Sequence, residues 1–113
     1  MRLKSSIFVS ALMRREQAEG AFATILRKGA EEGGTVYIVH LKPQGADVYA
    51  PAPQLFIGET NPFERYFEQR LDAADPAAVS DYLDKQVRFD SDCWIVEIEK
   101  SAPLTSIQVV AGA

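Results

Sequence analysis

Hydrophobic and polar positions divide the first twenty residues into a short strand and a helix. Residues 7–9 are β-formers, whereas residues 11–19 are nearly all strong helix formers. Ser10 can cap this helix at its start, and Gly20 can end it in the left-handed conformation. We predict a strand that passes into a helix, and a continuous strand over residues 6–14 is the alternative.

Three segments with strand character follow. Residues 21–28 alternate between two faces, residues 35–41 are rich in β-branched side chains, and residues 47–49 run back after a turn at 43–45. Residues 29–34 contain glycines, but Glu31 and Glu32 would repel a phosphate, so this segment is predicted to be a connecting loop. The pattern predicts a three-stranded antiparallel meander.

Two helices are predicted in the second half of the chain. Alternating prolines at 51 and 53 take the chain out of the sheet, and residues 54–60 are predicted to be a loop. Asn61-Pro62 starts a helix over 62–71, and Asp75-Pro76 starts one over 76–88. Each carries an apolar stripe at helical spacing: Phe63, Tyr66, Phe67 and Leu71 in the first, Val79, Tyr82, Leu83 and Val87 in the second.

Residues 88–100 read as a polar turn that leads into a strand over 93–99. The start of this strand is apolar on both faces, so the strand must lie inside a covered sheet, paired with residues 35–41. Asp90 and Asp92 are structural residues that cap backbone amides of the turn, and Trp94 fills the space between layers.

The predicted fold class is α+β, an antiparallel sheet of four to five strands with two helices packed on one face. Residues 1–100 form one domain, and residues 101–113 form a C-terminal tail that is flexible or an edge strand. The chain of 113 residues, 47% apolar and 25% charged, has the size and composition of one ordinary globular domain.

The segment that follows Arg2 and Lys4 does not satisfy the pattern of a secretory signal. Its apolar run is short, and Arg14, Arg15 and Glu16 precede the nearest small-residue cleavage triplet. No run approaches the roughly 20 apolar residues of a membrane span. One cysteine offers no internal disulfide. We expect a cytoplasmic protein without a membrane partner.

His40 and Cys93 are the first candidates for reaction chemistry. A catalytic histidine needs an orienting acid and a nucleophile, and a metal site needs two or three further ligands. Cys93 lies in an apolar run without a local signature, and His40 lies on a predicted strand. A buried thiol and a hydrogen-bonded strand histidine are favoured, so no catalytic residue, metal site or cofactor is predicted.

Acidic residues near the C-terminus are the second candidates. Asp90 and Asp92 resemble the start of a calcium loop, but Trp94 and the apolar residues after it replace the remaining ligands. Glu97 and Glu99 share one face of the predicted strand, as paired carboxylates do in glycosidases. A solvated or ion-paired edge is favoured, and a small carboxylate-dependent enzyme stays as an alternative.

The basic residues of the first thirty positions are the candidate binding site: Arg14, Arg15, Arg27 and Lys28. Residues 1–30 carry six basic and two acidic residues, +4, whereas the remaining residues carry six basic and fourteen acidic ones, −8. The cluster can bind an acidic partner or a nucleic-acid backbone, or it can pair with acids of the same chain. The overall acidity and the lack of interleaved aromatic residues favour internal pairing over nucleic acid.

Several segments together give the chain a resemblance to the bacterial domain-of-unknown-function family 1491. The resemblance spans about residues 2–100 and lies in residues 2–5, 11–15, 20–29, 50–54 and 88–99. Ser91 and Cys93 stand where proline and leucine are expected in such a family. The resemblance implies a cytoplasmic bacterial protein and brings no activity.

The residues and the resemblance leave the biochemical function unknown. We expect a non-enzymatic protein-interaction or regulatory module that binds an unknown protein partner or associates with itself as a homodimer. Association with nucleic acid through the basic residues and a carboxylate-dependent enzyme are the alternatives.

Overall fold

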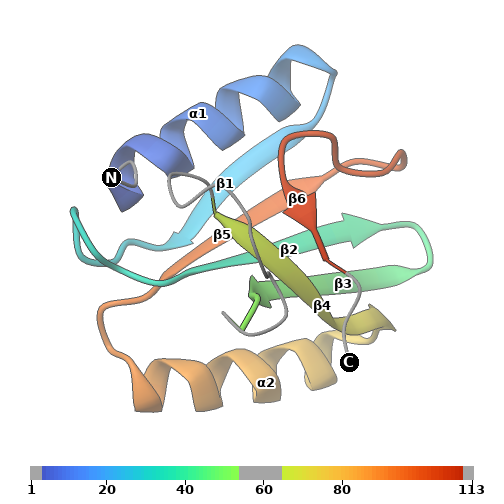
Figure 1. Cartoon of the computed structure of the whole chain (residues 1–113). Helices are drawn as coiled ribbons and strands as arrows, with labels where there is room; N and C mark the ends of the chain where they lie inside the picture. Colours follow the sequence, from blue (N-terminus) through green and yellow to red (C-terminus); the bar gives the residue numbers. More distant parts are fainter. Residues whose placement is uncertain (1–3, 54–64, 111–113) are drawn as a thin grey trace.

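The computed structural model describes residues 4–53 and 65–110, which form two helices and a six-stranded sheet (Figure 1). In chain order the elements are α1 (Ser5–Ala18), β1 (Phe22–Arg27), β2 (Val36–Lys42), β3 (Gly45–Pro51), β4 (Tyr66–Ala74), α2 (Pro76–Phe89), β5 (Trp94–Glu99) and β6 (Gln108–Val109). The α+β class is confirmed. Within the described part of the chain, no helix is long and apolar enough to cross a membrane.

The sheet is mixed, with the strand order β1-β5-β2-β3-β4-β6. β5 pairs with β2 and β6 pairs with β4 in parallel, whereas the other neighbours are antiparallel. The prediction of an antiparallel sheet of four to five strands is therefore wrong in its strand number and direction. The predicted pairing of β5 with β2 is confirmed.

β5 also separates two strands that we predicted to be neighbours. β2 and β3 form the expected hairpin, but β1 lies beyond β5 instead of beside β2. The physical reason is burial, because Trp94, Ile95, Val96 and Ile98 of β5 are all buried and a strand apolar on both faces requires an interior position. β1 has mostly exposed side chains and takes the edge.

α1 begins earlier than predicted, and residues 7–9 are helical instead of extended. Neither the short strand nor the continuous strand is present. The inward stripe of α1 consists of Ser5, Val9, Leu12 and Glu16, so its two ends are polar and hydrophobic periodicity does not reveal it. Gly20, with φ of 92°, follows the helix as predicted.

The second half of the chain contains one of the two predicted helices. α2 is confirmed, with Asp75 accepting a hydrogen bond from the Ala78 amide at 2.8 Å. The helix predicted over 62–71 is wrong where it can be compared, since β4 begins at Tyr66 and residues 62–64 lie outside the described part. Pairing with β3 overrides the local helical stripe, and Phe67 enters the core from a strand.

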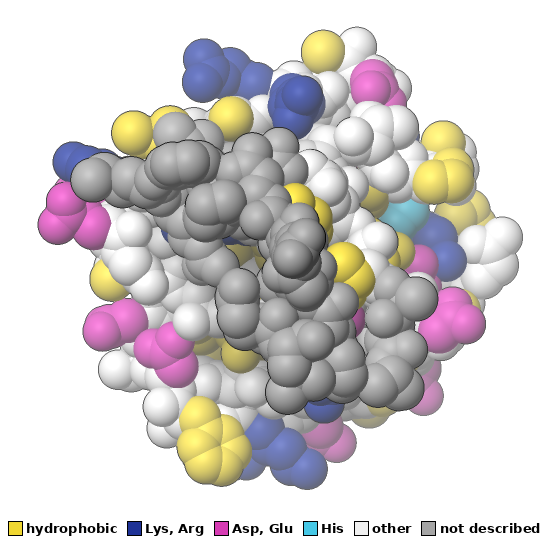
Figure 2. Space-filling model, viewed as in Figure 1, with side chains coloured by type: hydrophobic (Ala, Val, Ile, Leu, Met, Phe, Trp, Pro, Cys, Tyr) yellow, Lys and Arg dark blue, Asp and Glu magenta, His cyan; other side chains and the backbone are white. Residues whose placement is uncertain are grey.

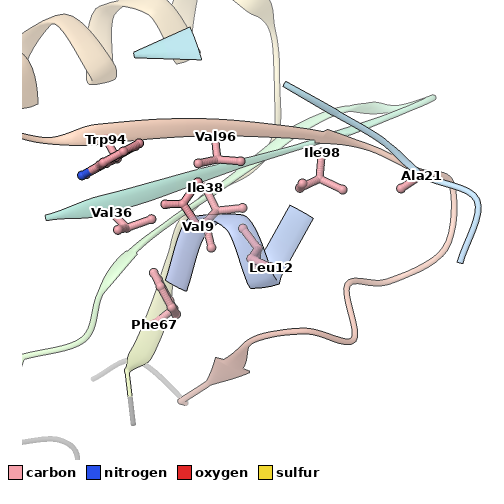
Figure 3. Packing of buried hydrophobic residues seen from close by; sticks show 9 residues of the cluster. All are labelled: Val9, Leu12, Ala21, Val36, Ile38, Phe67, Trp94, Val96 and Ile98. Atoms are coloured by element: carbon pink, nitrogen blue, oxygen red, sulfur yellow. The ribbon is translucent and has the colours of Figure 1, made fainter. Parts of the chain in front are cut away.

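The helices lie on opposite faces of the sheet, so the predicted packing on one face is wrong (Figure 1). Val9 and Leu12 of α1 pack against Ile38 and Val96 (Figure 3). On the other face, Leu83 of α2 packs in a second cluster with side chains of β2, β3 and β5. In β2 and β5, the residues that point to one face of the sheet and those that point to the other are both mostly apolar. Both faces of these strands therefore have to be covered.

Candidate binding surface

The part of the α2 side of the sheet next to β1 is not covered by the helix. α2 packs over β3 and β4 and its core cluster includes Ile95 of β5, whereas β1 and the end of β5 lie beyond this cluster. The register of β1 and β5 places five side chains on this uncovered side, which we call the open sheet face: Phe22, Thr24, Leu26, Glu97 and Glu99.

The β1 side chains of the open sheet face are more exposed than apolar residues of a folded sheet usually are. The exposed fraction is 74% for Phe22 and 51% for Leu26. On the α1 side of the same strand, Ala23 packs against the buried core. β1 is also a sheet edge, and apolar edge strands readily accept another chain.

A groove of about 400 Å³ lies between the open sheet face and α2. Its apolar lining includes Leu26 of β1, Val39 of β2, Ile95 of β5 and Val79 of α2. Few polar side chains reach this lining, and the groove therefore favours apolar groups over small polar substrates.

Two carboxylates line this groove, one from the sheet and one from the helix. Glu97 comes from β5 and is half-buried, and Asp84 comes from α2 and is exposed. Within the described ranges, neither carboxylate forms an ion pair. A half-buried carboxylate beside apolar side chains gains from a cation that reaches it.

The predicted basic site is divided between the two ends of one helix–strand hairpin. α1 and β1 run in opposite directions before and after Gly20. Arg14 and Arg15 therefore lie near the start of β1, while Arg27 and Lys28 lie at its end. Six residues of strand separate these positions by about 20 Å. The two residues of each pair are consecutive in the chain, and the structure places the two pairs at opposite ends of β1.

Basic side chains do not gather in one patch on the face that Figure 2 shows. Lysine and arginine side chains form separate groups there, some near α1 and others near α2. The Arg27 guanidinium donates to the Ser91 carbonyl at 2.7 Å and so contributes to the loop before β5. Lys28 is exposed, as are Arg14 and Arg15.

Trp94, Asp90 and Asp92 connect the turn before β5 to the loop before β2. Trp94 donates from its indole nitrogen to the Ala30 carbonyl at 2.7 Å, and the Ala30 amide donates to the Asp92 carbonyl at 2.8 Å. Asp90 accepts from the Asp92 amide at 3.0 Å. A Cβ on Gly34 would lie 2.5 Å from the Asp92 carbonyl oxygen and 2.8 Å from Trp94 Cδ1, so only glycine fits there.

His40 and Cys93 lie on opposite sides of the sheet. His40 is paired with Ile98 and its Nε2 lies 2.8 Å from the Lys100 carbonyl oxygen, whereas Cys93 belongs to the α2-side core. Burial raises the pKa of the Cys93 thiol. The two side chains therefore cannot act as a nucleophile and base. In residues 4–53 and 65–110, no group of three or more histidine, cysteine or acidic residues is arranged to hold a metal.

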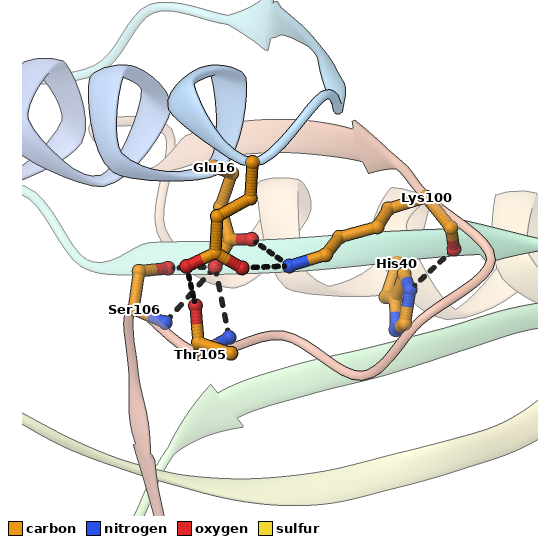
Figure 4. Close-up of polar contacts among 6 residues, drawn as sticks. Glu16, His40, Lys100, Thr105 and Ser106 are labelled. Carbon is orange, nitrogen blue, oxygen red and sulfur yellow. Dashed lines mark hydrogen bonds and ion pairs between the residues drawn. The ribbon is translucent and has the colours of Figure 1, made fainter.

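A buried carboxylate that the sequence did not reveal holds the C-terminal segment against α1. Glu16 is fully buried and accepts from Lys100 Nζ at 2.7 Å, from the amides of Thr105 and Ser106 at 3.1 and 2.9 Å, and from the Ser106 hydroxyl (Figure 4). Burial alone would raise the pKa of Glu16, but these hydrogen bonds together lower it. Lys100 also pairs with Glu19 at 2.8 Å.

This network is structural. Every donor around Glu16 belongs to the chain itself, so the carboxylate has no free lone pair directed at a substrate. It was missed because its partners are about ninety positions away in the sequence and the chain has many other Glu and Lys residues.

The family described as "Protein of unknown function (DUF1491)" matches residues 3–107. The chain belongs to the DUF1491 family. This confirms the resemblance that the sequence indicated. None of the curated proteins matches the chain.

Solved structures of related proteins have the same fold as this DUF1491 protein. It is similar to the solution structure of protein Atu0922 from A. tumefaciens, with 40% identity over 100% of this chain and 98% of that chain and a TM-score of 0.85. It is also similar to a DUF1491 family protein from Caulobacter crescentus CB15. The crystal structure gives 29% identity over 96% and 98% of the two chains and a TM-score of 0.78. These neighbours are structural genomics targets or members of the same family, and no function is assigned to them.

Proposed function

We propose that this DUF1491 protein is a non-enzymatic protein-interaction module that acts in the bacterial cytoplasm. Its partner binds on the open sheet face and in the adjoining groove. The observation that carries this proposal is the exposure of Phe22 and Leu26 on one side of an edge strand, next to a groove with an apolar lining. Exposed apolar side chains on an edge strand beside an apolar groove favour contact with another protein.

The composition of the surface supports a protein partner over nucleic acid. Glu97 and Glu99 belong to the open sheet face, where they would repel phosphates. The basic residues that could bind phosphates belong to two separated pairs, Arg14–Arg15 and Arg27–Lys28. Enzymatic use of these carboxylates has no supporting observation, because the groove beside them is mostly apolar.

The proposal is tested by identifying a partner and measuring its affinity with purified proteins. Tagged wild type, Leu26→Asp and Phe89→Ser are used as baits in a nuclease-treated lysate of the source organism. Phe89 is a matched control because it is 91% exposed at the end of α2 and does not line the groove. A protein enriched by wild type is then purified and its Kd is measured for all three baits.

We expect Leu26→Asp to weaken binding more than about tenfold, since an aspartate would be desolvated in an apolar contact. Phe89→Ser should bind like wild type. Equal affinity of the Leu26→Asp variant would contradict the proposed surface, provided that thermal unfolding shows that the variant is folded. Loss of the partner upon nuclease treatment would favour the nucleic-acid alternative instead.

A further inference from the structure

The space beside α2 has the width of one additional helix. β2, β5 and β1 follow one another in the sheet on the side away from β4, and their neighbours β3 and β4 carry α2. Tyr37 and Val39 of β2 are already buried in the α2 cluster, so the open width is that of β5 and β1, about 10 Å at about 4.8 Å spacing, and a helix with its side chains is about 10–12 Å wide. A helix in this position would cover the part of this sheet face that α2 leaves open.

The chemistry of the groove specifies which helix fits. Leu26, Val39 and Ile95 provide apolar lining from the sheet. Glu97 comes from the same sheet, where it pairs with Val39, Asp84 comes from α2, and neither forms an ion pair in the part of the chain described. A helix that is apolar all round would cover Glu97 and leave its charge uncompensated, which is costly. A helix with lysine or arginine residues on both sides of its apolar stripe would pair with both Glu97 and Asp84.

We propose that the open sheet face and the groove receive an amphipathic helix of a partner protein, whose apolar stripe is flanked by lysine or arginine residues. This inference rests on the proposed function and names the class of partner. The apolar stripe of this helix lies against the apolar lining between α2 and β1. Its cationic side chains reach Glu97 on the sheet and Asp84 on α2.

A second copy of the chain fits the groove less well than such a helix. Its basic pair, Arg14–Arg15, belongs to α1 on the opposite side of the sheet, so this contact would be head-to-tail and would not close into a dimer. If α2 of a second copy entered the groove, Asp81 and Asp84 would approach Glu97 with like charge.

The test uses three synthetic peptides of about 18 residues, enough for five helical turns. The first has leucines at helical spacing with flanking lysines. The second replaces the lysines with glutamates, and the third is a scramble of the first with the same composition. Binding is measured by fluorescence anisotropy, and the contact surface is mapped by amide chemical shifts of the labelled protein.

We expect the first peptide to bind at least about tenfold more tightly than either control peptide, with shifts confined to β1, β5 and the groove side of α2. Glu97→Gln combined with Asp84→Asn should weaken it by about tenfold, and added salt should weaken it as well. Phe89→Ser serves again as the control that keeps full affinity. Sedimentation of the free protein measures self-association.

Equal binding of the first peptide and its scramble would overturn the inference, and so would full affinity of the double variant. Dimers in which the groove residues are protected would also overturn it and make a second copy the occupant. The proposed function is judged separately, by the purified natural partner and Leu26→Asp. If that partner depends on Leu26 but not on Glu97 and Asp84, the interaction surface stands and the cationic helix fails.

Discussion

Replacement of Glu16 by glutamine tests the network that joins α1 to the C-terminal segment. The carboxylate is fully buried and has four donors around it. Glutamine has nearly the same shape, but its amide would direct N–H groups at the Lys100 ammonium or at the backbone amides of residues 105 and 106. At least one donor then loses its acceptor in a buried site.

The expected loss of folding free energy depends on which groups remain paired after the substitution. Removal of one partner from a buried ion pair costs about 3–5 kcal/mol. Lys100 keeps Glu19 at 2.8 Å, which offsets part of this cost. We therefore expect a loss of about 3 kcal/mol, a large fraction of a typical stability of about 5–15 kcal/mol. For a domain of this size, the melting temperature falls by about 12 °C.

The assay is urea unfolding together with amide hydrogen exchange. Glu16→Gln should lower the free energy of unfolding and expose the amides of Thr105 and Ser106 to faster exchange. Glu19→Gln is the matched control, since the Glu19 side chain is about half exposed, and it should cause a smaller loss. The reasoning is refuted if both variants lose the same stability while the two amides stay protected.

Three further predictions concern pH, a close backbone approach and the thiol. The pKa of the Glu16 carboxyl is lowered by its hydrogen bonds, and the pKa of the Asp47 carboxyl is lowered, against its burial, by Lys42 Nζ at 2.7 Å and the Ala73 amide at 2.8 Å. The stabilisation from these carboxylates is therefore present above their ordinary pKa values of 4.5 and 3.8 and is lost as the pH falls. Urea midpoints should therefore decrease below about pH 4.5, and Glu16→Gln should make this decrease shallower. Gly34→Ala should destabilise the protein by about 1–3 kcal/mol in thermal unfolding, because the new Cβ would be overpacked. Gly33→Ala should be tolerated, since nothing lies within 4 Å of its new Cβ. Equal losses of stability in the two variants would contradict this geometry. Cys93, fully buried with a raised pKa, should react with a thiol reagent in urea but not in the native protein, and native reaction at the rate of the unfolded chain would show that it is accessible.

Local signals in the sequence predicted the elements whose boundaries depend on near neighbours. Asp75 and Pro76 mark the start of α2 because capping and a fixed φ act within one helical turn. Gly20 marks the end of α1 for the same reason. The apolar residues of β5 indicated a covered strand, which the structure places between β1 and β2.

Long-range interactions explain the errors. Ser5 and Glu16 are polar but lie on the buried stripe of α1, since their partners come from the loop at residue 34 and from residues 100–106. Phe67 has helical spacing with its neighbours, yet pairing with β3 makes it part of a strand. In each case the partner that decides the conformation is distant in the sequence.

The open sheet face was likewise predictable from the sequence only in its local features. The sequence indicated that Glu97 and Glu99 share one strand face, and this follows from the twofold periodicity of a strand. It could not indicate that β1 would place Phe22 and Leu26 beside them, because strand order depends on which segments bury the most surface. The basic residues were close in the sequence, but a hairpin of helix and strand separated them.

The sequence by itself determined the fold class, the family, the position of α2 and the buried character of β5, since these depend on composition and on contacts within a few residues. Only the tertiary structure decided that the helices cover opposite faces, that Glu16 is a buried acceptor and that the β1 end of one sheet face stays open. These features arise from pairing between segments that are far apart along the chain. Loop closure and burial of the whole chain determine such pairing, and no local pattern records it.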